Sequence, residues 1–280
     1  MVKKLSEYKD KIKNMCWSYS RLTSFGHCKY EFYLNYIIND DKLYLSEGNY
    51  YAEVGIFVHD ILARIFNKFA QNKKSEQLSL KEASQYFVDN YDNNIFYKVK
   101  KSTMKKTFEL CANYFADEDF KWLDNYEIIG VELESKFKIK GYDFIVYIDL
   151  LLKDKRDNKF VILDHKSSPY PLKLNGEVKK NSQQSFGTYK KQMYLYSYAV
   201  KELYGEFPKE IKWNHFKDGG KIVSIPFKEE EYKNTIDWFI NNIHKIEKES
   251  KFEPNLDYFY CTNLCNFRHC CEYCKATDWK

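Results

Sequence analysis

Two short stretches decide the fold of this chain: Phe144-Ile-Val-Tyr-Ile-Asp-Leu-Leu-Leu-Lys153 and Phe160-Val-Ile-Leu-Asp-His-Lys166. Both are runs of apolar, largely β-branched and aromatic residues separated by a polar turn, which is typical of buried β-strands. Each run nevertheless contains an acidic residue, Asp149 in the first and Asp164 in the second. Because burying an unpaired carboxylate is costly, these two acids are candidates for a functional site rather than for the core.

A strand with alternating residues precedes these two stretches. From Val131 to Ile139, mostly apolar residues alternate with Glu and Lys, which predicts one half-buried strand. Gly141–Tyr142 is the expected tight turn between this strand and the next. Two further strands are expected near residues 211–216 and 221–227.

The rest of the chain is mostly helical by its apolar spacing. Helices are expected at about residues 18–38, 54–69, 79–97, 102–122, 183–204 and 229–248. We therefore expect one α/β domain over residues 1–280, with a mixed central sheet flanked by helices. Within it, residues 16–125 are the helical N-terminal portion, residues 126–250 the core, and residues 251–280 a Cys-rich tail.

The composition excludes several classes of protein. Aromatic residues make up 18% of the 280 residues, which argues against disorder as the main state. No run of 18 apolar residues is present, so no membrane span is expected. Residues 1–15 are charged and lack the apolar region of a secretory signal, so we expect a cytoplasmic protein. The net charge of +5 permits an acidic partner without requiring one.

The cysteines are unevenly distributed. Five of the eight lie in the last twenty residues: Cys261, Cys265, Cys270, Cys271 and Cys274. In a reducing compartment such a cluster indicates metal or iron–sulfur ligation before it indicates disulfides. The other three cysteines are Cys16, Cys28 and Cys111.

The strand acids can be placed relative to one another. Residues i and i+2 of a strand point to the same face, so Asp164 and Lys166 project together while His165 points away. A turn at Gly141–Tyr142 sets Glu134 opposite Asp149, with Glu132 diagonally adjacent, and a slip of two residues exchanges these roles. Clustered carboxylates repel one another unless a cation lies between them, and oxygen ligands suit Mg²⁺ or Mn²⁺. A nearby lysine can orient an attacking water.

Three more residues are weaker candidates on spacing alone. His59 lies near the edge of the apolar stripe of its helix, where a histidine is more often packed or solvated than a metal ligand. Gln192 and Tyr196 lie one turn apart, so they share a helical face. Such a face could bind phosphate or base edges, although an ordinary half-exposed helix in a Tyr-rich chain has the same pattern.

The order of these residues resembles the PD-(D/E)XK nuclease superfamily, in its RecB/AddB-like exonuclease branch. His59, a Glu-bearing strand, Asp149, Asp164-His165-Lys166 and Gln192-x-x-x-Tyr196 follow one another as in that branch. The segment that begins Trp17-Ser-Tyr-Ser-Arg-Leu-Thr-Ser-Phe-Gly resembles its N-terminal segment, and Gly55-Ile-Phe-Val-His59 resembles its His motif. The resemblance covers nearly the whole chain, from about Cys16 to Cys274. It implies a restriction-endonuclease-like fold.

The resemblance also implies a role for each site residue. The metal ligands would be the side chains of His59, Asp149 and Asp164 and the main-chain carbonyl of His165. Lys166 would position and activate the water, while Gln192 and Tyr196 would hold the DNA strand near the scissile phosphate. The upstream acid is either Glu132 or Glu134, and the sequence does not choose between them. Tyr147-Ile148-Asp149 lacks the usual glycine of the family's acid motif.

For the cysteines, the resemblance implies a 4Fe–4S cluster that joins the two ends of the chain. Cys28 would be one ligand and Cys261, Cys265 and Cys271 the other three, with Cys270 and Cys274 as alternative ligands. The x₃ spacing between Cys261 and Cys265 departs from the usual x₂ of the branch. Four thiolates also suit tetrahedral zinc, which is the alternative.

The expected function is that of a metal-dependent DNA exonuclease acting on single-stranded DNA or DNA ends. Within the family, the chain is more similar to the stand-alone enzymes of recombination, repair, phage replication or CRISPR adaptation than to the long helicase–nuclease subunits. The reason is that the sequence has no Gly-rich phosphate loop of a helicase motor. We expect a bacterial cytoplasmic protein, or a phage protein in a bacterial host. A homo-oligomer and a protein partner from recombination or CRISPR adaptation both stay open. The alternative is a non-catalytic nucleic-acid-binding module with a zinc-stapled tail.

Overall fold

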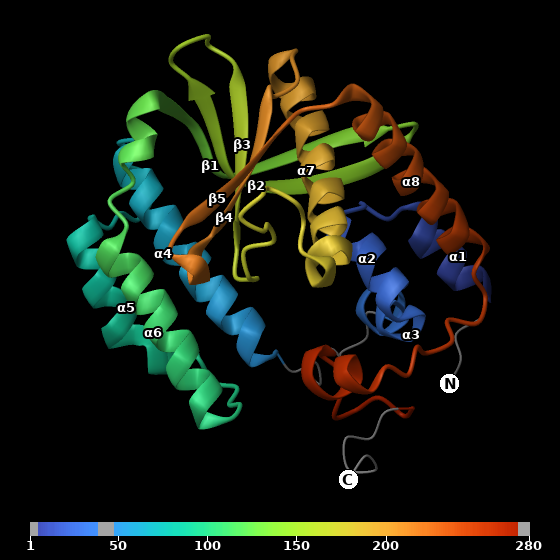
Figure 1. Cartoon of the computed structure of the whole chain (residues 1–280). Helices are drawn as coiled ribbons and strands as arrows, with labels where there is room; N and C mark the ends of the chain where they lie inside the picture. The colour runs from blue at the N-terminus through green and yellow to red at the C-terminus, as the bar shows by residue number, and fades with distance from the viewer. Residues whose placement is uncertain (1–4, 39–47, 274–280) are drawn as a thin grey trace. The chain divides into compact units, whose positions relative to one another are not determined.

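A computed structural model of the chain describes residues 5–38 and 48–273. The fold is α/β: a five-stranded mixed sheet is flanked by helices, and the N-terminal region is helical (Figure 1). This is the expected fold class, and it is consistent with a restriction-endonuclease-like architecture. In the part of the chain that the structure describes, no helix is both long enough and apolar enough to cross a membrane.

The chain divides into two compact units, which are described separately. The first unit comprises residues 1–49, 136–145 and 233–280, and the second comprises residues 50–135 and 146–232. Neither unit is continuous in sequence. The expectation of a single domain with boundaries near residues 125 and 250 stays a prediction.

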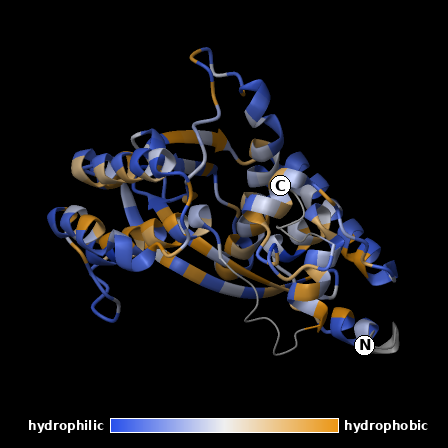
Figure 2. Ribbon diagram, turned by 90° about the horizontal axis from the view of Figure 1, so that it is seen from below, coloured by the Kyte–Doolittle hydropathy of each residue, from blue (hydrophilic) through white to orange (hydrophobic). Residues whose placement is uncertain are grey.

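The second unit begins with three amphipathic helices. These are α4 (Tyr50–Phe69), α5 (Leu80–Asn94) and α6 (Lys101–Asp117). Apolar and polar residues recur in turn along the helical ribbons (Figure 2), as expected for helices that bury one face. Ser79 and Glu82 form a capping box at the start of α5, where each side chain bonds the backbone N–H of the other. The buried faces of the three helices form one apolar cluster with Leu150, Leu152, Val161 and Leu163 of the sheet.

The sheet has the strand order β1-β2-β3-β4-β5. Its strands are β1 (Tyr126–Ile139), β2 (Tyr142–Asp154), β3 (Phe160–Lys166), β4 (Glu210–His215) and β5 (Lys221–Pro226). β3 pairs antiparallel with β2 and parallel with β4, and β5 pairs antiparallel with β4. The sheet is therefore mixed, with the acid-bearing strands β2 and β3 side by side.

The parallel step from β3 to β4 is made by α7 (Gln183–Tyr204), which follows a short 3₁₀ turn, η4 (Lys180–Ser182). Along β3, Val161 and Leu163 face the cluster of α4 to α6. Lys166, on the opposite face by strand alternation, contacts α7. Two more 3₁₀ turns belong to this unit, η3 (Lys121–Asn125) before β1 and η5 (Phe216–Asp218) after β4. One end of β3 thus lies within reach of α4 on one side and α7 on the other.

The first unit contains the N-terminal helices and the Cys-rich segment. Its elements are α1 (Leu5–Lys13), α2 (Tyr19–His27), α3 (Lys29–Phe32), the π-helix η1 (Tyr33–Ile38), the greater part of α8 (Glu229–Lys248) and the π-helix η6 (Tyr260–Leu264). The prediction of one helix over residues 18–38 is wrong, because Cys28 interrupts it in an extended conformation with φ −152°. The N–H of Cys28 bonds the carbonyl of Ser24 and so ends α2. The apolar spacing continues through the break and therefore hides it.

The predicted turn between the first two strands is also wrong by one residue. β1 ends at Ile139 and β2 begins at Tyr142, so the two turn residues are Lys140 and Gly141. Both have positive φ, +49° and +89°, as a type I′ hairpin turn requires. With the expected turn at Gly141–Tyr142, the numbers of two facing residues beside the turn add up to 283. With the observed turn at Lys140–Gly141 they add up to 281. This is the slip of two residues that exchanges the expected places of Glu132 and Glu134.

Candidate active site

Three side chains from α4, β1 and β2 meet in the second unit. Among the residues that the structure describes, His59, Glu132 and Asp149 are the one set of three or more His, Cys, Asp or Glu side chains whose ligand atoms all lie within 4.8 Å of one another. The donors are one imidazole nitrogen and two carboxylate oxygens, a set that suits Mg²⁺ or Mn²⁺. The residues present therefore fit a divalent metal.

The main chain of β3 completes this grouping. His59 Nε2 lies 3.1 Å from the carbonyl oxygen of His165, and His59 Nδ1 lies 3.5 Å from Asp149 Oδ2. The same Asp149 oxygen accepts a 2.8 Å hydrogen bond from the backbone N–H of His165. The carbonyl of His165, expected as a ligand, thus points at the same place as the side chains of His59 and Asp149.

The geometry distinguishes between the two upstream glutamates. Glu132 belongs to the group with His59 and Asp149, and Glu134 does not. Glu132 has φ +46°, in the left-handed region that a non-glycine residue seldom adopts. Such strained residues cluster at functional sites. This conformation interrupts the regular pleat of β1, which period-two reasoning assumes.

Lys166 is held beside the acids at the end of β3. Its Nζ lies 2.6 Å from Asp164 Oδ2 and donates a 2.9 Å hydrogen bond to Gln192 Oε1. The ammonium also lies 4.7 Å from the centre of the Tyr189 ring, within the range of a cation–π interaction. Three side chains, one on β3 and two on α7, therefore fix the position of this ammonium.

Gln192 links this lysine to the next residue of the expected motif. Gln192 Nε2 donates a 2.7 Å hydrogen bond to the hydroxyl of Tyr196, one turn further along α7. Both side chains are therefore on the face of α7 that reaches Lys166. All six expected catalytic residues of the second unit lie in one connected group: Glu132, Asp149, Asp164, Lys166, Gln192 and Tyr196.

The acids of this group are held at unusual pKa values. The Glu132 side chain is partly exposed to solvent, but desolvation by its neighbours, reinforced by the charge of Asp149, raises its pKa to about 7. Burial also raises the pKa of Asp164 to about 6, with Lys166 opposing the shift. Burial alone would lower the pKa of Lys166, but the charges of Asp164 and Asp149 outweigh it and the pKa rises. The local negative charge is thus only partly compensated by Lys166, and a further cation would be favoured.

The sequence analysis assigned no role to two residues that support the site. Asn214 of β4 is buried and its Nδ2 lies 3.0 Å from His165 Nδ1 and 2.7 Å from the hydroxyl of Tyr114. Burial lowers the pKa of His165 well below its usual value, so the ring is neutral. Asn214 carried no signal in the sequence, because β4 also contains Glu210, Lys212 and His215. For Tyr189, the signal was its place three residues before Gln192 on the same helix.

The expected cluster cysteines meet in the first unit. Cys28, Cys261, Cys265 and Cys271 are all buried and line one small hollow. Cys270 is exposed. The other alternative ligand, Cys274, lies outside the described residues.

The hollow also contains groups that act on the thiols. Burial, reinforced by Glu31, raises the pKa of Cys265 to about 12. Glu31 is itself buried, and burial raises its pKa although Tyr260 Oη donates a 2.6 Å hydrogen bond to it. Thiols bind metals only as thiolates, and a bound metal deprotonates them. The four buried thiols therefore fit a metal or cluster that supplies the compensating positive charge.

The fold and this site define an α/β protein with a candidate divalent-metal site, a lysine beside it and a separate group of four thiols. A sequence model of the PD-(D/E)XK nuclease superfamily matches residues 16–272, and the chain belongs to that superfamily, whose members use divalent metals. No curated protein matches the sequence. Among solved structures, one match is the crystal structure of a protein named "Putative exonuclease" from Eubacterium rectale. The two chains are 16% identical, the match covers 98% of this chain and 93% of the other, and the TM-score is 0.48.

Proposed function

We propose that the protein is a metal-dependent DNA exonuclease that hydrolyses phosphodiester bonds on single-stranded DNA or at DNA ends. The observation that carries the proposal is the meeting of His59, Glu132 and Asp149 beside the Lys166–Asp164 pair. The Lys166 ammonium beside these acids supplies positive charge where a scissile phosphate would lie.

The site residues have distinct roles in this reaction. The divalent ion would be held by His59, Asp149 and Asp164 with the His165 carbonyl, and it would supply Lewis-acid stabilisation of charge on the scissile phosphate. Glu132 is the further acid at this site, and Glu134 is not needed. Lys166 orients the attacking water through its ammonium and offsets the negative charge that develops at phosphorus. Gln192 and Tyr196 hold the DNA strand by hydrogen bonds to its phosphates.

The hydrolysis then proceeds as an in-line displacement. A water oxygen attacks phosphorus, the bond from phosphorus to the 3′ oxygen breaks, and the leaving oxygen takes up a proton. The proton lost by the water passes to solvent or to a site carboxylate. Glu132 is suited to accept it, because its raised pKa of about 7 is close to neutral pH.

We propose further that the chain belongs to the RecB/AddB-like iron–sulfur branch and carries a 4Fe–4S cluster on Cys28, Cys261, Cys265 and Cys271. The burial of these four thiols around one hollow supports this assignment. The cluster would tie residue 28 to the C-terminal segment and so stabilise the first unit, as a cross-link that closes a long loop does. Anaerobic purification with absorbance near ~400 nm and metal analysis tests it. A colourless protein loaded with zinc would show the alternative.

The nuclease proposal is tested by cleavage of labelled DNA in the presence of Mn²⁺. Lys166→Met and Asp164→Asn should each lower the cleavage rate by about 10²–10⁴-fold. Lys190→Met is the matched control, because Lys190 lies on α7 in an ion pair with Glu231 outside the site. If both site variants cleave like the wild type, Lys166 and Asp164 are not catalytic and the proposed site is wrong. If the wild type binds DNA but does not cleave it, the protein is the alternative, a non-catalytic nucleic-acid-binding module.

Comparing linear with circular single-stranded DNA tests the need for a free end. An exonuclease should leave the circle intact, whereas an endonuclease should cut both. The biological setting that we propose is recombination, repair, phage replication or CRISPR adaptation in a bacterial cytoplasm. In each of these settings, other proteins expose the DNA ends on which such an enzyme acts.

A further inference from the structure

The loop between β3 and α7 carries an exposed leucine that the fold does not use. Leu174 is 111% exposed, more than any other large hydrophobic residue among those the structure describes. The loop leaves the end of β3 directly after Lys166 (yellow in Figure 1). Single exposed apolar residues are common on protein surfaces, so the exposure matters only if the loop is built to present it.

The loop is a short, internally bonded hairpin of residues 171–179. Leu172 and Val178 form an antiparallel bridge, and the backbone N–H of Lys173 donates to the carbonyl of Glu177 at 2.8 Å. Gly176 closes the tip with φ +82° and donates a 3.0 Å hydrogen bond to the Lys173 carbonyl. Leu174 is therefore held at the tip of a defined turn rather than in an irregular loop.

The base of the hairpin is attached to η5 and to the end of β4. The backbone N–H of Tyr170 donates to Asp218 at 2.6 Å, and Lys179 Nζ donates to the Tyr170 carbonyl at 2.7 Å. His215 Nδ1 lies 2.9 Å from the Ser168 carbonyl, next to the residues that follow Lys166. These contacts fix the hairpin at its base, while its tip stays in solvent.

The surroundings of the hairpin suit a polyanion. Lys173 and Lys180 are exposed on it or beside it, and Lys173 pairs with Glu177 of the same hairpin at 2.8 Å. The ammonium groups of Lys179 and Lys221 lie 6.0 and 5.8 Å from the ring of Tyr170. Lysines that surround an apolar tip match the charge of a DNA backbone next to its bases.

We propose that this hairpin is a wedge that separates bases at a DNA end, with Leu174 inserted at the terminal base pair and the lysines on the phosphates. The inference rests on the proposed nuclease function and names how its substrate strand reaches the site. Aliphatic side chains serve as such wedges in other DNA-binding proteins, where they unstack one base step at a cost of a few kcal/mol. An aliphatic residue suits separation of bases better than stacking, for which aromatic residues are used.

The experiment uses Leu174→Ala and, as a matched control, Leu203→Ala, another exposed leucine, near the end of α7. The first readout is the fluorescence of 2-aminopurine placed at the end of a blunt duplex, in EDTA so that no metal-dependent hydrolysis occurs. The wild type and Leu203→Ala should raise the fluorescence, and Leu174→Ala should not. Equal rises with all three proteins would overturn the proposal.

The second readout is cleavage with Mn²⁺ of a blunt duplex and of single-stranded oligo-dT, whose bases stack weakly. Leu174→Ala should lower duplex cleavage by about tenfold or more and leave oligo-dT cleavage within about twofold of wild type. An equal effect on both substrates contradicts a wedge.

If the wild type cleaves neither DNA but the fluorescence result holds, the wedge stands and the nuclease function is wrong. If Leu174→Ala changes only the oligomeric state on size-exclusion chromatography, the hairpin binds protein and the wedge is wrong.

Discussion

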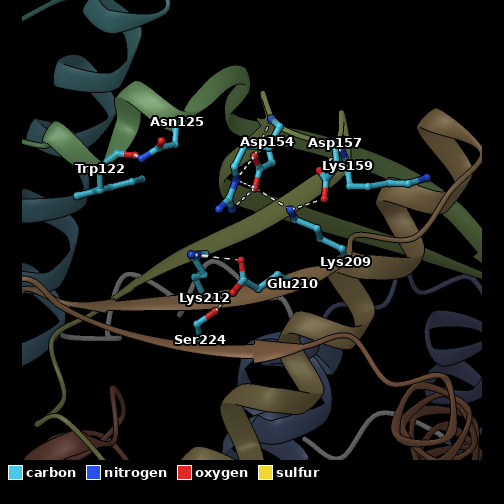
Figure 3. Close-up of polar contacts among 10 residues, drawn as sticks. Trp122, Asn125, Asp154, Asp157, Lys159, Lys209, Glu210, Lys212 and Ser224 are labelled. Carbon is cyan, nitrogen blue, oxygen red and sulfur yellow. Dashed lines mark hydrogen bonds and ion pairs between the residues drawn. The ribbon is translucent and has the colours of Figure 1, made fainter.

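Two acids of β2, Asp149 and Asp154, lie in opposite electrostatic surroundings. At the end of the strand, Asp154 is fully buried and accepts hydrogen bonds from the backbone N–H and guanidinium of Arg156 and from Lys209 Nζ (Figure 3). These bonds hold the pKa of Asp154 well below its usual range. Around Asp149, in the middle of the strand, desolvation outweighs the available partners and the pKa values of Glu132 and Asp164 are raised.

The difference separates a structural acid from a functional one. Asp154 has enough cationic and N–H donors among its own neighbours, so the folded state favours its charged form. The group of Glu132, Asp149 and Asp164 has one ammonium, from Lys166, for three carboxyls. Active sites commonly sacrifice stability in this way. The comparison predicts that substitutions in the group around Asp149 and at Asp154 affect activity and stability in opposite patterns.

The largest expected effect is that of Glu132→Gln on activity. Removing this carboxylate should lower DNA cleavage by about 10²-fold or more, measured with saturating Mn²⁺. Because the substitution removes a like charge beside Asp149, the free energy of unfolding in urea should be equal to or higher than that of the wild type.

Glu134→Gln is the matched control, two residues away on β1 and outside the group with His59 and Asp149. It should cleave DNA within about twofold of the wild-type rate. If Glu134→Gln loses activity and Glu132→Gln does not, the assignment of the upstream acid is reversed.

Asp154→Asn should show the opposite pattern. Loss of the Asp154 carboxylate leaves Lys209 and Arg156 without their buried charged acceptor, so the free energy of unfolding should fall by about 1–3 kcal/mol. DNA cleavage at 25 °C should stay close to the wild-type rate. Asp157→Asn is the control, because Asp157 contacts the same Lys209 but is half exposed, and its unfolding should match the wild type. If folded Asp154→Asn loses activity, Asp154 is not a purely structural acid, and its contrast with the group around Asp149 is wrong.

Much of this arrangement could be predicted from the sequence. β3, α7 and α8 have the expected bounds, because their periodicity is strong and their ends carry polar or glycine signals. The acids stand out since each interrupts an apolar strand. What could not be predicted depends on backbone conformation: the positive φ of Glu132, the I′ turn one residue early and the break at Cys28. Apolar spacing carries no information about these three features.

Metal binding should stabilise only the proteins with an intact site. At a Mn²⁺ concentration of about ten times the dissociation constant, the wild type should gain about 1.4 kcal/mol in the free energy of unfolding. Asp154→Asn should gain the same amount, although its free energy of unfolding without metal is lower than that of the wild type. Glu132→Gln should gain less, because it removes one negative charge from the group of His59, Glu132 and Asp149. Equal gains in all three proteins would place the bound Mn²⁺ elsewhere. No gain in the wild type when Mn²⁺ is returned after EDTA treatment would show that the site binds no Mn²⁺.

The smallest expected effect is a change in the contribution of Asp154 to stability at acidic pH. The pKa of Asp154 is lowered in the folded state, so its stabilising contribution is present above its unfolded pKa of about 3.9 and is lost as the pH falls through the folded value. The difference in unfolding free energy between the wild type and Asp154→Asn should therefore be constant from pH 7 to about pH 5. It should shrink below about pH 4, as Asp154 takes up a proton and no longer pairs with Lys209 and Arg156. Urea unfolding at each pH measures it, with Asp157→Asn as the control. A difference that stays constant to pH 3 would be explained by packing rather than charge, and the contrast between Asp154 and the group around Asp149 would then not be electrostatic.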